Sequence, residues 1–160
     1  MSDNFKIGII GRGFVGGAVS NGFNKNVEQI IVDPVHSDTT LEQLIEQGPT
    51  LTFICVPTPP NEDGSINVDI VTDVLIELSM RDYKGVVVVK STIIPDYLQQ
   101  FKKEFDLKIV YNPEFLTEAN AHADFINPNM QVLGGKWKDC EVVEKAYLRH
   151  SSVKVVPTFK

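Results

Sequence analysis

The chain alternates short, continuously apolar runs with longer segments in which apolar residues recur every three to four positions. The first pattern is typical of buried strands and the second of helices packed on one side. Their alternation predicts a Rossmann-type α/β fold, a doubly wound and mainly parallel sheet with helices on both faces. No repeat or linker interrupts the pattern, so we expect a single domain over residues 1–160. The expected strands are Phe5–Ile10, Glu28–Val32, Leu51–Val56, Gly85–Val89, Lys108–Tyr111, Met130–Leu133 and Val153–Val156, and the expected helices are Phe14–Phe23, a short one that starts at Asp38–Thr40, Val68–Met80, Pro95–Lys103, Phe115–Ala121 and Lys138–Arg149.

A glycine-rich turn lies between the first expected strand and the first helix. Gly11, Gly13 and Gly16 have the spacing G-x-G-x-x-G. In that spacing the first glycine permits a tight turn, the second admits a pyrophosphate to the backbone, and the third lets the helix lie close to the strand. Free N–H groups at the helix start, near Phe14 and Val15, would face the phosphates. The strand before it and the helix after it make this common spacing a candidate dinucleotide site.

Asp33 ends the second expected strand, where an acid can accept hydrogen bonds from an adenosine ribose. No Arg or Lys lies in Pro34–Asp38 to receive a 2′-phosphate, so the sequence favours NAD over NADP. An Asp-Pro pair is also a common turn. His36 is either a neighbour of the adenine or a plain surface residue.

Three further loops leave the carboxyl ends of expected strands, at the sheet edge where ligands bind. They contain Thr58, Thr92 and Glu114. Each threonine hydroxyl could contact a ligand or cap a loop or helix, and the spacing leaves both readings open. If the segment after Pro113 is helical, Glu114 and Glu118 face the same side and could serve as base and hydrogen-bond acceptor. Acids at a helix start also stabilise the helix dipole.

Composition narrows the classes of function. The 160 residues carry a formal net charge of −6, which argues against a nucleic-acid partner. No apolar run reaches the ~20 residues of a membrane span, the N-terminus is no signal peptide, and there is no metal-ligand spacing. Cys55 and Cys140 lie in apolar surroundings, so we expect buried thiols and a reducing, cytoplasmic location.

Four segments resemble the N-terminal, NAD-binding domain of the UDP-glucose/GDP-mannose dehydrogenase family. They are KIGIIGRGFVGGAV, FICVPTPPNEDGSINVDIV, VVVKSTIIPDYL and NPEFLTEANAHADFINPNMQVLGG. Together they cover nearly the whole chain. The VPTPP, KST-x-x-P and NPEFL-x-E elements, in that order, are more specific than the glycine turn, because other dehydrogenases such as the β-hydroxyacid class share only the glycines.

The resemblance implies an enzyme of the UDP-glucose 6-dehydrogenase kind, which oxidises the C6 alcohol of a nucleotide sugar to a carboxylate in two NAD-dependent steps. It implies that Glu114 activates water on a covalent intermediate and that Glu118 lies against the cofactor. The backbone of Phe115 and Leu116 would touch the nucleotide sugar. Thr92 would line the nicotinamide end, and it joins the two glutamates as a candidate catalytic residue. The implied NAD-binding residues are Gly11, Gly13, Phe14, Val15, Gly16, Asp33, Val56, Thr58, Thr92 and Glu118.

The chain also departs from the family. A long helical segment follows the second strand in the family, whereas here a short connection over residues 35–40 does, which we expect to remove or shrink an edge strand. Thr117 and Met130 stand where the family usually has basic residues. The family continues with a long central helix, which carries a catalytic Lys and Asn and builds the dimer. A C-terminal domain then supplies a Cys nucleophile that neither cysteine of this chain matches.

The first hypothesis is the cofactor half of such an enzyme, cut short or completed by a separate chain, which binds NAD without turnover. The second is a non-catalytic NAD-binding or interaction module derived from the family. In either case, apolar surface left by the missing helix would favour self-association or a partner chain. A third option, a complete small dehydrogenase with Glu114 as base, lacks a proton acceptor unless Lys90 serves, and Lys90 reads more simply as the end of its strand.

Overall fold

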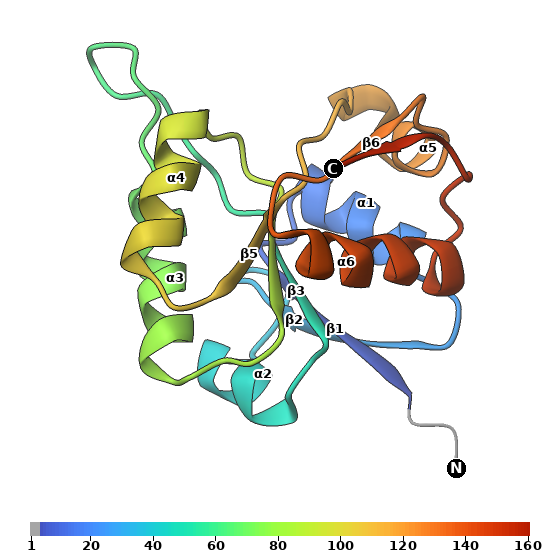
Figure 1. Cartoon of the computed structure of the whole chain (residues 1–160), viewed down its shortest axis with the longest axis horizontal. Helices are drawn as coiled ribbons and strands as arrows, with labels where there is room; N and C mark the ends of the chain where they lie inside the picture. Colours follow the sequence, from blue (N-terminus) through green and yellow to red (C-terminus); the bar gives the residue numbers. More distant parts are fainter. Residues whose placement is uncertain (1–3) are drawn as a thin grey trace.

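The computed structural model describes residues 4–160. Its centre is a five-stranded parallel sheet in the order β2-β1-β3-β4-β5 (Figure 1). The predicted parallel, doubly wound architecture is therefore confirmed. The strands are β1 (Phe5–Ile10), β2 (Val27–Val32), β3 (Leu51–Ile54), β4 (Val86–Val89) and β5 (Lys108–Tyr111).

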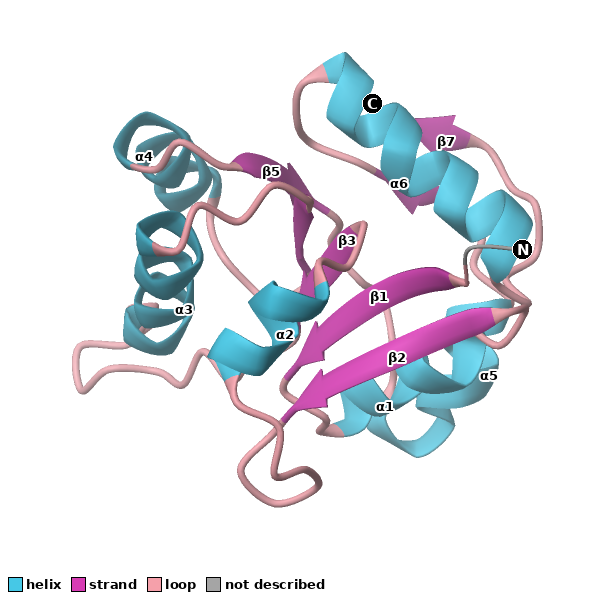
Figure 2. Ribbon diagram, turned by 90° about the horizontal axis from the view of Figure 1, so that it is seen from below, coloured by secondary structure: helices cyan, strands magenta, loops and turns pink. Residues whose placement is uncertain are grey.

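Helices cover both faces of the sheet (Figures 1 and 2). One face packs against α1 (Phe14–Gly22), α5 (Ala121–Ile126) and α6 (Trp137–His150), and the other against α2 (Leu41–Gln47), α3 (Asp69–Met80) and α4 (Pro95–Glu104). Alternate residues of each strand enter the two cores, as the pleat requires. In β4, for example, Val86 and Val88 join the first core and Val87 and Val89 the second.

The chain changes direction across the sheet between β1 and β3. From β1 it passes through α1 to β2 on one side, and from β2 it returns through α2 to β3 on the other. In open α/β sheets, ligands bind at the carboxyl ends of the strands at such a switch point. Here these ends are joined by a hydrogen bond of 2.8 Å from Cys55 N to Ile10 O. The glycine turn that begins at Gly11 therefore lies where this fold binds its ligands.

The connection after β2 contains no strand, as the short segment predicted. Residues 33–40 lead into α2, which a capping box starts: the Gln43 backbone N–H donates to the Thr40 hydroxyl, and the Thr40 N–H donates to the Gln43 side chain. Gly48 ends the helix with a φ of 60°. β2 is therefore an edge strand of the sheet.

The expected helix over Phe115–Ala121 is wrong. A 3₁₀ turn starts only at Glu118 and leads into α5 at Ala121. The reason lies in Thr117, whose backbone N–H and hydroxyl both donate to Asp124, at 2.9 and 2.7 Å, and whose own backbone is extended. Glu114 consequently precedes the helical segment, and it does not share a helix face with Glu118.

The expected last strand over Val153–Val156 is also wrong. The backbone there bonds to helix ends, since Ser152 N donates to Gly22 O and Lys154 N to Ile126 O, both at 2.8 Å. The strand forms later, as β7 (Thr158–Phe159), which pairs in parallel with β6 (Gln131–Val132) in a separate two-stranded sheet. An alternating apolar pattern predicts a strand only where a partner strand is within reach. Within residues 4–160, no helix is long and apolar enough to cross a membrane.

Candidate functional site

The three glycines of the turn differ in what surrounds them. Gly11 has a φ of 85°, and a Cβ there would lie 2.7 Å from the Cys55 carbonyl oxygen. A Cβ at Gly16 would lie only 1.9 Å from the Gly11 carbonyl oxygen. At Gly13, by contrast, a Cβ would meet no atom within 4 Å. Two glycines are thus required by the fold itself, whereas the third keeps backbone open to an incoming ligand.

Asp33 lies buried against this turn. Arg12 N donates to Oδ2 at 2.6 Å, and the backbone N–H groups of Val35 and His36 donate to Oδ1, both at 2.9 Å. His36 Nδ1 also lies 2.8 Å from Oδ1. The hydrogen bond from Arg12, supported by those from Val35 and His36, holds the pKa of Asp33 well below its usual range. An ionised carboxylate therefore joins the tip of β2 to the glycine turn.

A cavity of about 250 Å³ opens beside the turn, at the carboxyl edge of the sheet. The start of α1 and the loops after β3, β4 and β5 contribute to its wall. Burial raises the pKa of the Cys55 thiol in this wall to about 12, so this cysteine is a neutral, unreactive group. The lining residues are Gly13, Phe14, Val15, Cys55, Val56, Pro57, Thr58, Lys90, Ser91, Thr92 and Glu114.

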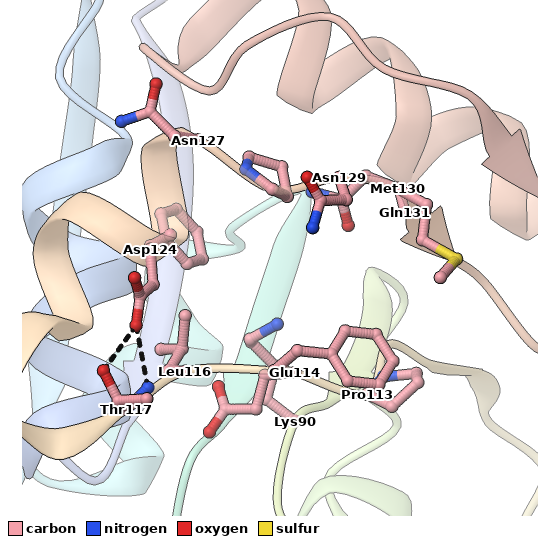
Figure 3. Close-up of a pocket in the computed structure, with 13 residues that line it drawn as sticks. Lys90, Pro113, Glu114, Leu116, Thr117, Asp124, Asn127, Asn129, Met130 and Gln131 are labelled. Carbon is pink, nitrogen blue, oxygen red and sulfur yellow. Dashed lines mark hydrogen bonds between the residues drawn. The ribbon is translucent and has the colours of Figure 1, made fainter.

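A second cavity, of about 300 Å³, shares Lys90 and Glu114 with the first (Figure 3). Asp124 and Thr117, joined by their hydrogen bonds, line this second cavity as well. Its remaining wall comes from residues 113–116 and from the loop between α5 and β6. Those residues are Pro113, Phe115, Leu116, Phe125, Asn127, Pro128, Asn129, Met130 and Gln131.

Lys90 belongs to a buried polar network behind the cavities. Its side-chain Nζ donates to the main-chain oxygen of Asn112 at 3.2 Å and to Asn112 Oδ1 at 3.1 Å. The Tyr147 hydroxyl donates to the same Oδ1 at 2.6 Å, and Asn112 Nδ2 donates to Val132 O at 3.0 Å. Lys90 Nζ also lies 5.6 Å from the centre of the Phe125 ring. The network joins β4, β5, β6 and α6 through Lys90, which the sequence analysis interpreted only as the end of a strand.

Two buried side-chain atoms of the described residues, Arg12 Nε and Glu114 Oε2, have no hydrogen-bond partner. Buried polar atoms are normally paired, so such orphans mark places where a ligand or partner is expected. Arg12 belongs to the glycine turn, and Glu114 lines both cavities. Burial raises the pKa of Glu114, and the nearby Lys90 opposes that rise.

The structure brings most of the sequence-predicted site residues together. Gly13, Phe14, Val15, Val56, Thr58, Thr92 and Glu114 line the first cavity, and Gly11, Gly16 and Asp33 form the turn beside it. Glu118 is exposed and lines neither cavity.

Sequence reasoning missed two contributions to the site. It set Lys90 aside, although a lone cation directly after a run of valines is a signal for a buried charge that needs partners. It also left the role of His36 open, and the structure shows this side chain in contact with Asp33. Cys55 and Cys140 are buried and free, as predicted.

Fold and site together define a class of protein, the Rossmann-type dinucleotide-binding domains. A pyrophosphate needs the open glycine at the helix start, and a ribose needs the acid at the neighbouring strand end. The sequence comparison narrows this class. Residues 33–151 match the UDP-glucose/GDP-mannose dehydrogenase family, NAD binding domain, and the chain belongs to this family. NAD is the cofactor for which this domain is named.

Curated relatives include the putative UDP-glucose 6-dehydrogenase YtcA of Bacillus subtilis, which is 32% identical over 126 residues, covering 71% of this chain and 29% of that protein. UDP-glucose 6-dehydrogenase AglM of Haloferax volcanii is 31% identical over 130 residues, covering 72% of this chain and 30% of that protein. The chain thus spans less than a third of these relatives.

Solved structures confirm the fold. A UDP-glucose dehydrogenase from Pyrobaculum islandicum superposes with a TM-score of 0.76 at 21% identity, over 99% of this chain and 46% of that one. A GDP-mannose dehydrogenase from Pseudomonas aeruginosa gives 0.70 at 22% identity, over 96% of this chain and 45% of that one.

Proposed function

We propose that the chain binds NAD along the carboxyl edge of the sheet, as the cofactor-binding part of a nucleotide-sugar 6-dehydrogenase. The observation that carries the proposal is the hydrogen bond from Arg12 N to Asp33, because it sets an ionised carboxylate against the glycine turn. The ribose of adenosine would donate to this carboxylate, and the pyrophosphate would meet the N–H groups that follow Gly13. The nicotinamide would lie in the first cavity, beside Thr58 and Thr92.

Space and charge at the turn fit this ligand. Backbone at Gly13 can be approached without displacing a side chain. Asp33 already accepts hydrogen bonds from the turn, so the ribose hydroxyls would add to these or replace the contact with His36. A bound NAD would supply the carbon that accepts a hydride. The chain itself would hold and orient the dinucleotide.

The proposed substrate class depends on the family and on Glu114. AglM is named for UDP-glucose, and another relative, from Azotobacter vinelandii, for GDP-mannose. We therefore assign to the whole enzyme the oxidation of a C6 alcohol of such a sugar to a carboxylate. Glu114 would act as the base that activates water where the two cavities meet. Glu118 stays a proposed cofactor contact that would need a movement of the 3₁₀ turn.

Further protein would complete the site. The exposed side chains of Phe115, Trp137 and Phe159 support self-association or the docking of a partner chain. Gel filtration at micromolar concentration should then show a species larger than the monomer, and a monomer alone contradicts this part of the proposal. The buried free thiols of Cys55 and Cys140 suit a reducing compartment, which supports a cytoplasmic location.

Calorimetric titration with NAD, NADP and UDP-glucose in parallel tests the proposal. We expect heat from NAD and much less from NADP, because the Asp33 carboxylate repels a 2′-phosphate. The variant Gly13→Val, which fills the open approach, should lose the NAD heat while its circular dichroism spectrum is retained. Folded wild-type chain that gives no heat with NAD would refute the proposal.

A turnover assay distinguishes the cofactor-binding part of an enzyme from a complete small dehydrogenase. With NAD and UDP-glucose together, the pure chain should form no NADH, because its residues supply only the cofactor side of the proposed site. NADH production would instead show a complete small dehydrogenase. A neighbouring reading frame that encodes the family's Lys, Asn and Cys segments would favour an enzyme half over a non-catalytic module.

A further inference from the structure

Lys90 and Glu114 are the two charged residues that line both cavities. Lys90 follows β4 and Glu114 follows β5, and these neighbouring parallel strands end at the same edge of the sheet. Figure 3 shows both side chains at one end of the second cavity. Among the described lining residues of the two cavities, Lys90 is the only cation. The positive charge of this region therefore comes from one lysine.

Lys90 is held as a buried group. Only 4% of the residue is exposed, and its side chain donates hydrogen bonds to two oxygens of Asn112. Amide oxygens carry no charge, so they satisfy the ammonium group without neutralising it. The face of the Phe125 ring, 5.6 Å away, also favours a cation. Burial lowers the pKa of Lys90, and the neighbouring Glu114 carboxylate opposes that fall. Because Lys90 has no ion-pair partner within 4.0 Å among residues 4–160, its positive charge depends on these neutral contacts and on Glu114.

Glu114 carries the opposite charge, and one of its oxygens is unpaired. Its Oε2 is buried and has no hydrogen-bond donor. A carboxylate in such a place is destabilised relative to the neutral acid, unless a nearby cation compensates. The other acid in the second cavity, Asp124, takes two hydrogen bonds from Thr117 and so offers Glu114 no compensation.

We propose that Lys90 is a positioning residue, the counter-charge that holds Glu114 as a carboxylate where the two cavities meet. Lys90 acts through space and through Asn112, which lies two residues before Glu114 and receives both hydrogen bonds from the ammonium group. A base functions only in its deprotonated form, so this counter-charge would make Glu114 competent near neutral pH. That use in catalysis rests on the proposed function, whereas the coupling of the two charges does not.

The other titratable groups that face Glu114 do not replace Lys90. Burial raises the pKa of Cys55 to about 12 and raises that of Tyr147 as well, so both remain neutral near pH 7. Asp124 is an acid and can only oppose the ionisation of Glu114. Burial raises the pKa of Glu114, and among these groups only Lys90 opposes that rise.

Carbon NMR of the labelled full chain tests the coupling without cofactor or substrate. The titration midpoint of the Glu114 carboxyl is measured in wild type, Lys90→Met and Lys90→Arg. We expect Lys90→Met to move it to higher pH, and Lys90→Arg, which keeps the charge, to restore most of the wild-type value. Lys84→Met is the matched control, because it removes an exposed lysine before the opposite end of β4 and should leave the midpoint in place.

Reciprocity gives a second readout that does not require Lys90 to be replaced. In Glu114→Gln the Lys90 ammonium loses its neighbouring anion, so its own midpoint must move to lower pH by the same amount as Lys90→Met moves that of Glu114. Lys90→Met leaves Asn112 with fewer donors, and if that variant does not fold, Glu114→Gln decides the question alone. An unchanged Lys90 midpoint in a folded Glu114→Gln chain overturns the proposal.

Tyr147→Phe separates charge from network structure. It removes a hydroxyl from the same Asn112 oxygen but leaves Lys90 in place. We expect no shift of the Glu114 midpoint, and a shift as large as that of Lys90→Met would show that the network, not the charge, controls Glu114. Because none of these titrations needs NAD, they can succeed where the calorimetric test of NAD binding fails, and the reverse.

Discussion

The glycine turn and the Lys90–Glu114 region lie along one sheet edge, but they are built in opposite ways. The turn is made of backbone: Gly11 and Gly16 lie against carbonyl groups, and Asp33 accepts hydrogen bonds from N–H groups on two sides. The second region is made of side chains: Lys90 is buried, Glu114 is half-buried, and one buried oxygen of Glu114 has no partner.

The difference shows that the chain preorganises the glycine turn but not the surroundings of Glu114. The turn has its geometry fixed before any ligand arrives, so a dinucleotide would meet preorganised amides and an ionised acid. Lys90 and Glu114 form no direct ion pair, so a ligand or another protein surface would be needed to compensate their charges. Substitutions in the turn should therefore act on stability and affinity, and those in the second region chiefly on titration.

Gly16→Ala is expected to have the largest effect. The new methyl group would approach the Gly11 carbonyl oxygen to 1.9 Å, and backbone cannot move aside as a side chain can. Overpacking of this kind costs about 3 kcal/mol at its upper end, which lowers the melting temperature of a chain of this size by roughly 6–12 °C. Thermal unfolding followed by circular dichroism measures it.

Gly17→Ala is the matched control, one residue further along α1. A Cβ there would contact only His122 Nε2, at 3.9 Å. Alanine in a helix interior is better than glycine by about 0.5–1 kcal/mol, so this variant should be slightly more stable than wild type. Equal losses of stability in the two variants would mean that the close approach at Gly16 does not limit the size of its side chain.

Asp33→Asn comes second, and it acts on affinity. The amide keeps the size of the carboxylate but loses its charge, and hydrogen bonds to charged groups contribute about 1.5–3 kcal/mol. NAD binding should weaken roughly 10- to 100-fold, as measured by calorimetry. The preference for NAD over NADP should shrink as well, because the repulsion of a 2′-phosphate is gone. Unchanged NAD affinity would remove Asp33 from the site.

Acid stability gives a third, smaller effect at the same residue. The folded-state pKa of Asp33 is depressed, so its contribution to stability is present above the unfolded pKa of about 3.9 and is lost as the pH falls through the folded value. Below about pH 4, wild type should therefore lose stability more steeply than Asp33→Asn. Urea unfolding at several pH values measures both slopes, and parallel slopes would contradict the role given to the Arg12 hydrogen bond.

The same contrast explains what the sequence could predict. The turn was predictable because its chemistry is local: spacing alone gave Gly11, Gly13 and Gly16, and an apolar run ended at Asp33. The second region depends on contacts between distant segments, such as that of Tyr147 with Asn112, which no local pattern encodes. For the same reason the expected helix after Pro113 was wrong, because hydrogen bonds to Asp124 decide where it begins.

Tyr147→Phe should have the smallest effect on stability, although its hydroxyl is buried. Asn112 Oδ1 keeps its hydrogen bond from Lys90 when the hydroxyl is removed, so no buried acceptor is left without a donor. The loss should then be that of one neutral hydrogen bond, about 0.5–1.5 kcal/mol, as measured by urea unfolding. Leu148→Ala, at an exposed position of the same helix, serves as the comparison for unspecific effects. A loss well above this range in Tyr147→Phe would mean that Lys90 cannot hold Asn112 alone, and the second region would then be as preorganised as the turn.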